Sequence, residues 1–259
     1  MAVNIEDAGF EIRDMLGWLY GSGFPKSHNI GHKVEKHKGW GTALKPAHEP
    51  IVMARKPFNT SVAENVLTHG TGGINIDECR VGTEKMKWQK RGKSVNYAKT
   101  TFKDRTGEVN EGRFPANIIN DGSEEVLEVF EESSRFFYCA KASKAERNMG
   151  LDDFDKKSNA FMATNNGTSG KASKGMERFK TQPKANYHPT VKPIKLMEYL
   201  VRLVTPKEGI VLEPFAGSGT TLIACKQQGF NYIGIEREQE YCDIAEARLK
   251  GVKIQGELF

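Results

Sequence analysis

Apolar and polar residues alternate in the first part of the chain, and this pattern predicts β-strands. Within residues 11–20, Ile12, Leu16 and Trp18 fall on one face, and a Gly-Ser-Gly-Phe-Pro turn follows directly. Residues 50–55 form a short apolar run, which is typical of a buried strand. The same signals predict further strands at residues 117–119 and 135–139 and a helix at residues 124–132.

After Pro189 the spacing of the apolar residues becomes helical. Leu196, Leu200 and Leu203 recur at three and four residues, and Pro193 suits the first turn of a helix over residues 193–204. The pattern then predicts a strand at 210–215, a helix at 220–228, a strand at 231–236 and a helix at 238–250. Such a unit holds two parallel strands joined by a right-handed crossover, so we expect an α/β fold.

The composition narrows the class of protein. The chain has 259 residues, 38% of them hydrophobic, and a net charge of +5, which suits one large domain or two small ones. Its longest apolar runs are far shorter than the ~20 residues of a membrane span, and its N-terminus lacks the apolar region of a secretory signal. The four cysteines have no Cys-x-x-Cys spacing, which argues against a disulfide framework or a zinc site. We therefore expect a cytoplasmic protein without a metal ion or a membrane partner.

Positive charge is concentrated in three segments, residues 26–38, 80–105 and 155–187. The second holds nine Lys and Arg against two acidic residues, with aromatic residues between them. Cations bind phosphates and aromatic rings stack on bases, so these segments indicate nucleic acid, although solvated basic loops are the alternative. His28 and His32 are four residues apart, but a basic turn facing DNA explains them better than a metal site. The candidate DNA-binding residues are Lys87, Trp88, Lys90, Arg91, Lys93 and Tyr97.

A glycine-rich turn, Glu213-Pro-Phe-Ala-Gly-Ser-Gly-Thr-Thr221, lies between the predicted strand at 210–215 and the helix after it. An α/β fold binds its nucleotide at such a turn. A dinucleotide fingerprint requires a third glycine where Leu222 stands, which argues against a nicotinamide enzyme. An adenosyl ligand needs only the close backbone approach that Gly217 and Gly219 permit. Glu236, at the end of the second strand, could accept the hydroxyls of a ribose, although it could equally cap a helix.

These residues resemble a known family. The turn resembles the S-adenosylmethionine loop of the amino-methylating DNA methyltransferases, and Tyr187-His-Pro-Thr-Val-Lys-Pro-Ile194 resembles the segment that precedes this loop in the circularly permuted β group. Residues 5–14, 45–51, 112–117 and 134–143 resemble segments of phage and bacterial adenine methylases. The resemblance implies a partial Rossmann-like methyltransferase sheet, formed by residues 1–60 and 188–259. It also implies an inserted basic target-recognition region at 61–153 and a flexible basic linker at 154–187.

The resemblance also implies a function and a site. The function is methyl transfer from S-adenosylmethionine to adenine N6, in preference to cytosine N4, in double-stranded DNA, within a bacterial or phage-infected cell. Thr220 and Thr221 would serve the free amides at the start of their helix, and Glu213 replaces the usual aspartate. The implied cofactor-binding residues are His188, Thr190, Lys192, Glu213, Phe215, Ala216, Gly217, Ser218, Gly219, Thr220 and Glu236.

The family's catalytic tetrad, [DNS]-Pro-Pro-[YFW], is not found, because no two prolines are adjacent in the chain. This tetrad accepts the protons of the target amine and stacks on the flipped base. In the permuted arrangement it precedes the segment that begins here, so we expect a late start codon, a split gene or a prophage remnant. The chain alone would then be inactive, with a second polypeptide supplying the tetrad. The rival interpretation is a non-catalytic DNA-binding remnant or partner subunit.

Overall fold

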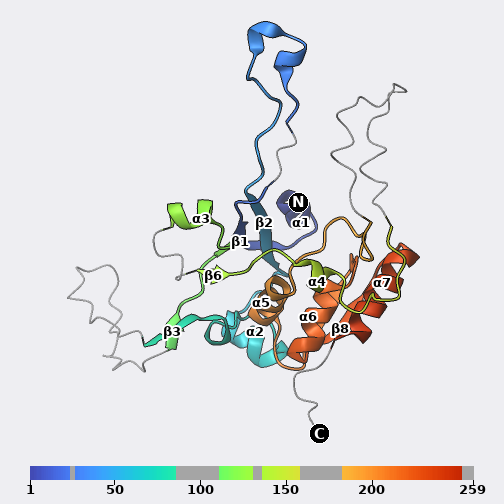
Figure 1. Ribbon diagram of the computed structural model, residues 1–259. Coiled ribbons are helices and arrows are strands. Elements are labelled where there is room, and N and C mark those ends of the chain that lie inside the picture. The colour runs from blue at the N-terminus through green and yellow to red at the C-terminus, as the bar shows by residue number, and fades with distance from the viewer. Residues whose placement is uncertain (24–26, 86–110, 131–135, 158–182, 253–259) are drawn as a thin grey trace, which may run out of the picture. The chain divides into compact units, whose positions relative to one another are not determined.

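The computed structural model describes residues 1–23, 27–85, 111–130, 136–157 and 183–252 (Figure 1). The chain forms two compact units, and each is assembled from separate segments. Unit 1 comprises residues 1–59 and 76–138, and unit 2 comprises residues 60–75 and 139–259. The predicted core segment 1–60 thus falls almost entirely in unit 1 and the predicted core segment 188–259 in unit 2.

Unit 1 is built on a four-stranded sheet in the order β2-β1-β5-β6. β1 pairs antiparallel with β2 and parallel with β5, and β5 pairs parallel with β6. Leu16, Trp18 and Ile119 are buried, which follows from the alternation along β1 and β5. The elements of this sheet and the helices of the same unit are α1 (Ala2–Asp7), β1 (Glu11–Leu19), β2 (His48–Arg55), β5 (Ile118–Asn120), α3 (Glu124–Val129) and β6 (Phe137–Tyr138).

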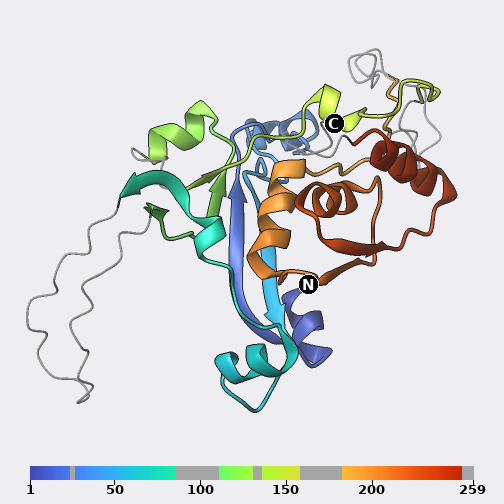
Figure 2. The same ribbon diagram turned by 90° about the horizontal axis from the view of Figure 1, so that it is seen from below.

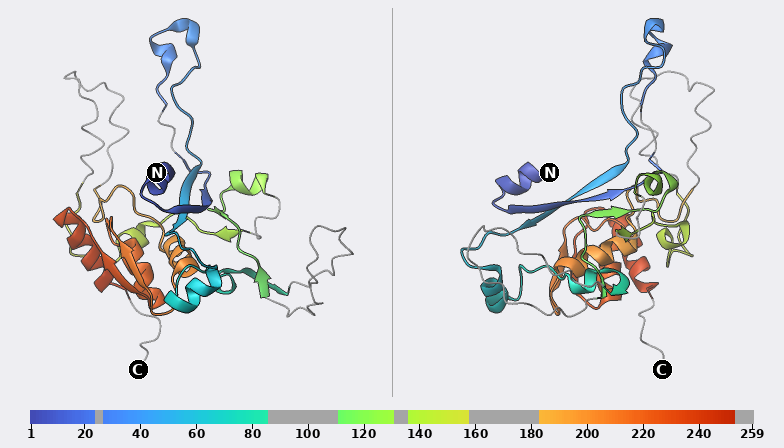
Figure 3. Two further views of the ribbon diagram at one scale, coloured as in Figure 1. Left: turned by 180° about the vertical axis from the view of Figure 1, so that it is seen from behind. Right: turned by 90° about the vertical axis from the view of Figure 1, so that its left-hand side faces the viewer.

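Two smaller parts complete unit 1. A second, two-stranded sheet pairs β3 (Val81–Lys85) antiparallel with β4 (Glu111–Arg113), after the short 3-10 helix η3 (Asp77–Cys79). The connection from β1 to β2 is a long arm that carries the 3-10 helices η1 (Ile30–His32) and η2 (Glu35–His37). Figure 3 shows this arm extending well beyond the ends of β1 and β2.

Unit 2 contains the strand–helix–strand–helix unit that the sequence predicts. β7 and β8 pair in parallel from Ile210 with Asn231 to Glu213 with Gly234. α6 is buried along six of its nine residues, so it forms the centre of the unit, and Figure 2 shows α6 and α7 on the same side of the strand pair. The elements are α2 (Val62–His69), α4 (Lys144–Arg147), α5 (Ile194–Val204), β7 (Ile210–Glu213), the glycine loop (residues 214–219), α6 (Thr220–Gln228), β8 (Asn231–Gly234) and α7 (Gln239–Lys250).

The predicted elements are confirmed with small shifts of their ends. α6 begins and ends where the sequence places it, and α5, α7, β1 and β2 differ by one or two residues. α2, α4 and the β3–β4 pair were not predicted, because short segments of mixed polarity have no clear period. All four cysteines are free. None of the helices in the described part of the chain has the length and apolar character needed to cross a membrane.

Candidate cofactor site

Hydrogen bonds from both ends hold the glycine loop of unit 2 in place. The Ala216 N–H donates to the carbonyl of Ile235 at 2.8 Å, which ties the loop to the end of β8. Glu213 accepts from the Phe215 N–H through Oε1 at 3.2 Å and from the Thr221 hydroxyl through Oε2 at 2.9 Å. Glu213 stands where the family that the loop resembles usually has aspartate. Its longer side chain accepts hydrogen bonds through both carboxylate oxygens.

Two residues of the loop must be glycine. Gly217 has φ +53°, and a Cβ there would lie 2.8 Å from Nε2 of His188. Gly219 has φ +77°, and a Cβ there would lie 2.9 Å from the Cβ of Ala245 on α7. Glycine adopts this left-handed backbone at little cost, whereas other residues do not. The two glycines therefore allow the left-handed backbone of the loop. They also allow close contacts, of Gly217 with His188 and of Gly219 with α7.

Glu236 follows β8, and its carboxylate lies against the glycine loop. Oε2 accepts from the Gly217 N–H at 2.8 Å, and Oε1 accepts from the Arg237 and Glu238 N–H groups at 2.8 and 3.0 Å. These amides, that of Glu238 above all, lower the pKa of Glu236. The carboxylate is therefore ionised at neutral pH. Oε1 already accepts two bonds, whereas Oε2 accepts one and keeps acceptor capacity for a further donor such as a hydroxyl.

His188 also lies against the glycine loop, next to Gly217. Its ring lies edge-on to that of Tyr241, with 4.6 Å between the centroids. Its Nδ1 accepts from the Thr190 N–H at 3.4 Å. Nδ1 is thus the acceptor nitrogen, and the proton of a neutral ring is on Nε2, the atom nearest to Gly217.

The surroundings of His188 favour its neutral form. Burial lowers the pKa of His188 below its ordinary value of 6.5. The positive charges of Arg147, Arg248 and Lys192 lower the pKa further, while Glu236 raises it. Lys192 is therefore close enough to His188 to influence the protonation of its imidazole, as Arg147, Arg248 and Glu236 also are. A neutral histidine can donate from Nε2 without adding positive charge beside a cationic ligand.

The segment that carries His188 is supported by a buried asparagine, which the sequence analysis did not single out. Asn186 is fully buried, and its Oδ1 accepts from the His188 N–H at 3.1 Å. Its Nδ2 donates to the Arg147 carbonyl at 2.8 Å, and its own N–H donates to Asn148 Oδ1 at 3.1 Å. Glu146, on α4, accepts from the Ile194 N–H at the start of α5. The residues around α4 thus position the segment from 186 to 194.

Arg248 on α7 is a second residue that the sequence did not reveal, and it is fully buried. Its Nη1 donates to the Ser218 carbonyl at 2.5 Å, to the Ser218 hydroxyl at 3.1 Å and to the Thr220 hydroxyl at 3.2 Å. Its Nη2 donates to the Glu146 carbonyl at 3.3 Å. Burial lowers the pKa of Arg248 to about 10, so the guanidinium stays charged at neutral pH. One cation therefore joins the glycine loop, α4 and α7.

Most of the predicted cofactor residues come together in this site, with differences in detail. The Thr220 and Thr221 hydroxyls bond to Arg248 and Glu213, and α6 has no side-chain cap, so the threonines do not serve the helix amides as predicted. The Phe215 side chain is 86% exposed beside the loop. The predicted DNA-binding residues, Lys87, Trp88, Lys90, Arg91, Lys93 and Tyr97, lie outside the described residues.

Known proteins that are similar in sequence to this chain match it over part of their own length. It is 44% identical over 79 residues to the Type II methyltransferase M.HinfI of Haemophilus influenzae, which covers 30% of this chain and 22% of that protein. It is 25% identical over 261 residues to the Type II methyltransferase M.HindIII of Haemophilus influenzae, which covers 96% of this chain and 58% of that protein. The chain thus spans well under two thirds of the length of each of these relatives.

Solved structures and a family model also match most of the chain. The complex of M1.HpyAVI with S-adenosylmethionine matches with a TM-score of 0.40 and 20% identity, over 96% of this chain and 67% of that one. The cytosine-N4-specific PvuII DNA methyltransferase matches with a TM-score of 0.42 and 14% identity, over 98% and 55% of the two chains. The model of the N6/N4 DNA methylase family matches residues 1–247. The chain belongs to this family, whose methyl donor is S-adenosylmethionine.

Proposed function

We propose that this chain binds S-adenosylmethionine and takes part in methyl transfer to adenine N6, in preference to cytosine N4, in duplex DNA. The observation that carries the proposal is the site around the glycine loop. An ionised carboxylate and a neutral histidine both lie against Gly217, in a loop whose glycines allow close approach. The preference for adenine rests on the likeness of residues 45–51, 112–117 and 134–143 to adenine methylases.

The residues of the site fit an adenosyl cofactor. When bound, S-adenosylmethionine supplies an electrophilic methyl group on a sulfonium sulfur. Oε2 of Glu236 has acceptor capacity for a ribose hydroxyl, and the exposed ring of Phe215 offers an apolar face to the adenine. His188, Thr190 and Lys192 would hold the methionine part, with the Lys192 ammonium pairing with its carboxylate. Leu222 stands where a dinucleotide fingerprint has its third glycine, which disfavours a dinucleotide.

The acceptor side of the reaction needs residues that these 259 positions do not contain. The lone pair of an exocyclic amine is delocalised into the base, so the amine becomes nucleophilic only when its protons are accepted. The family does this with the proline-proline tetrad, and none of the ten prolines here is next to another. We therefore place the tetrad on a strand from outside these residues, either on the same polypeptide or on a second one.

β7 and β8 offer a place for such a strand. Within the described residues β7 pairs with β8 along one edge, and the other edge has no partner strand. Large apolar residues of this strand pair are more than half exposed, namely Ile210, Leu212 and Ile233, and so is Ile235 directly after β8. Unpaired strand edges and clustered apolar side chains are typical of surfaces that another chain covers. A tetrad strand beside β7 would also end next to the glycine loop.

Cofactor binding is tested by calorimetric titration of S-adenosylmethionine into the full chain. Glu236→Gln should weaken binding at least tenfold, because an amide that donates cannot replace an oxygen that accepts from the Gly217 N–H and from a ribose. Glu246→Gln is the matched control, since Glu246 is an exposed carboxylate on α7. Equal affinity of wild type and Glu236→Gln would show that the cofactor does not use this site.

Methyl transfer is tested with methyl-labelled cofactor and duplex DNA. The chain alone should leave the DNA unlabelled, and adding a tetrad-bearing polypeptide encoded beside it should produce N6-methyladenine in the digested DNA. Label in cytosine would correct the base, and label from the chain alone would overturn the need for an outside tetrad.

The absence of the tetrad also favours a second candidate, a DNA-binding subunit that keeps the cofactor site but has no catalytic part. This protein would bind DNA and leave it unlabelled with every added polypeptide.

A further inference from the structure

The arm between β1 and β2, residues 27–45, is an ordered surface segment that has no hydrophobic core of its own. None of its residues is buried, and Figures 1 and 3 show it standing away from the β1–β2 hairpin. Connections of this length inside a compact unit are uncommon, and they usually carry function. The arm therefore needs an explanation other than packing.

Hydrogen bonds across the arm hold its two sides together. The Ser27 hydroxyl accepts from the Thr42 and Ala43 N–H groups at 2.9 and 3.3 Å, and the Thr42 hydroxyl accepts from the His28 N–H at 2.9 Å. Farther out, the N–H of residue 30 donates to the carbonyl of residue 40 at 2.9 Å. A polar framework of this kind fixes a shape without burying apolar surface, so its outer side chains are held ready for a partner.

The outer side chains of the arm are mostly cationic, with one prominent aromatic ring. Residues 27–45 contain four lysines and one glutamate, a net charge of +3 with the histidines neutral. Lys33, Lys36 and Lys38 are all exposed. Trp40 is 62% exposed, and one side of its ring is supported by His37, with the centroids 4.9 Å apart. The free side of the indole therefore faces solvent among lysines.

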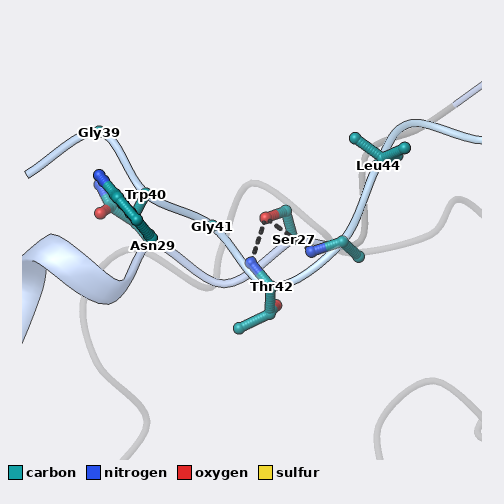
Figure 4. A pocket seen from close by; sticks show the side chains of 8 residues that line it. Ser27, Asn29, Gly39, Trp40, Gly41, Thr42 and Leu44 are labelled. Atoms are coloured by element: carbon teal, nitrogen blue, oxygen red, sulfur yellow. Dashed lines mark hydrogen bonds between the residues drawn. The ribbon is translucent and has the colours of Figure 1, made fainter. Parts of the chain in front are cut away.

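An open pocket of about 660 Å³ lies beside this ring (Figure 4). Asn29 pairs across the arm with Gly41, the residue after Trp40. The residues that line the pocket are Ser27, Asn29, Gly39, Trp40, Gly41, Thr42, Ala43 and Leu44 (Figure 4). An amide that can donate and accept beside a flat ring suits the edge and face of a nucleobase. The surrounding ammonium groups suit phosphates.

We propose that the arm is a DNA-binding element, separate from the cofactor site, in which Lys33, Lys36 and Lys38 contact phosphates and Trp40 packs against a base or sugar. The inference rests on the proposed DNA substrate and adds a contact surface to it. DNA is favoured over an acidic protein, because a flat ring among ammonium groups matches bases as well as phosphates. DNA is favoured over a membrane, because the exposed large apolar side chains of the arm are few, namely Val34, Trp40 and Leu44.

The test measures binding of the full chain to a fluorescein-labelled duplex at a series of salt concentrations. Each phosphate contact contributes about 0.9 to the slope of log K against log salt, so K33Q/K36Q/K38Q should reduce the slope by about 2.7. The matched control is K56Q/K207Q/K250Q, which removes three exposed lysines outside the arm and should change the slope less. Trp88 is itself a candidate DNA contact, so the emission test uses a Trp88→Phe background, in which Trp18 and Trp40 are the two tryptophans left. Because Trp18 is buried, Trp40→Phe in this background should remove the DNA-dependent quenching of tryptophan emission.

The outcomes separate this inference from the proposed function. An unchanged slope in the arm variant, with wild-type DNA binding intact, refutes the arm and leaves the proposed function standing. A wild-type chain that binds cofactor but no duplex refutes the DNA substrate and the arm together. Binding of the arm to anionic vesicles without binding to DNA would assign it to a membrane surface instead. Cofactor affinity should be the same in wild type and in both triple variants.

Discussion

Replacing Gly219 by alanine should both destabilise unit 2 and impair cofactor binding. Gly219 is the N-cap residue of α6 and has φ +77°. A side chain in this left-handed conformation costs roughly 1–2 kcal/mol. The new Cβ would also lie 2.9 Å from the Cβ and 3.2 Å from the Cα of Ala245, closer than the ordinary contact range of 3.4–4 Å. α7 would have to move away by several tenths of an ångström, and forced repacking of this kind costs roughly 1–3 kcal/mol.

The same helix provides a matched control for this change. Gly229, the C-cap of α6, has φ +76°, and no atom lies within 4 Å of a Cβ built there. Gly229→Ala should therefore lower the free energy of unfolding by the backbone cost alone, about 1–2 kcal/mol, because the new Cβ meets no other atom. The sum for Gly219→Ala is about 2–5 kcal/mol, so the two variants should differ by about 1–3 kcal/mol.

Urea unfolding followed by circular dichroism measures both losses, and titration with S-adenosylmethionine measures binding. Gly229→Ala should bind the cofactor like wild type, whereas Gly219→Ala should bind at least tenfold more weakly. Equal stability losses would show that Ala245 does not constrain the loop. Wild-type affinity in Gly219→Ala would refute the assignment of the loop to the cofactor.

Three further predictions test other parts of unit 2. Arg248→Met should lower the free energy of unfolding by about 2–4 kcal/mol in urea, since buried carbonyls that lose their donor cost about 1–3 kcal/mol each; no loss would mean that the guanidinium does not hold the loop. The pKa of His188 is lower in the folded state than in the unfolded state, so the stability that neutral His188 contributes is complete above pH 6.5 and is lost as the pH falls toward the lowered pKa. The melting temperature of His188→Gln should therefore fall less on acidification than that of wild type. Burial raises the pKa of Cys139 to about 12 and of Cys225 to about 11, so mass spectrometry should find both alkylated later than the partly exposed Cys242, and early labelling of Cys225 would contradict its place inside α6.

The C-terminal elements could be predicted from sequence because their signals are local. α6 runs from Thr220 to Gln228 as expected, with Gly219 before it and Gly229 after it. Glycine supplies the left-handed backbone at both ends, and nine residues of apolar and helix-forming type lie between them. β7 and β8 begin at Ile210 and Asn231 as predicted, and each ends two residues earlier than predicted, at Glu213 and Gly234. Neighbouring residues alone contain this information.

The internal framework of the cofactor site could not be predicted in that way. Arg248 lies thirty residues after Ser218 in an amphipathic helix, where an arginine is ordinarily exposed, and only the packing of α7 against the glycine loop buries it. Asn186 likewise meets Arg147 and Asn148 across almost forty residues. Sequence patterns report which face of an element is apolar, but not which polar atoms from distant elements will meet there.

By itself, the sequence determined the strand–helix–strand–helix unit, the glycine loop with Glu236, and the family to which these motifs belong. The tertiary structure alone decided how that loop is held: Glu213 braces it, His188 and Ala245 limit its glycines, and Arg248 joins it to α4. The reason is physical. Secondary structure and turns depend on residues a few positions apart, whereas a buried polar group must find its partners wherever folding brings them.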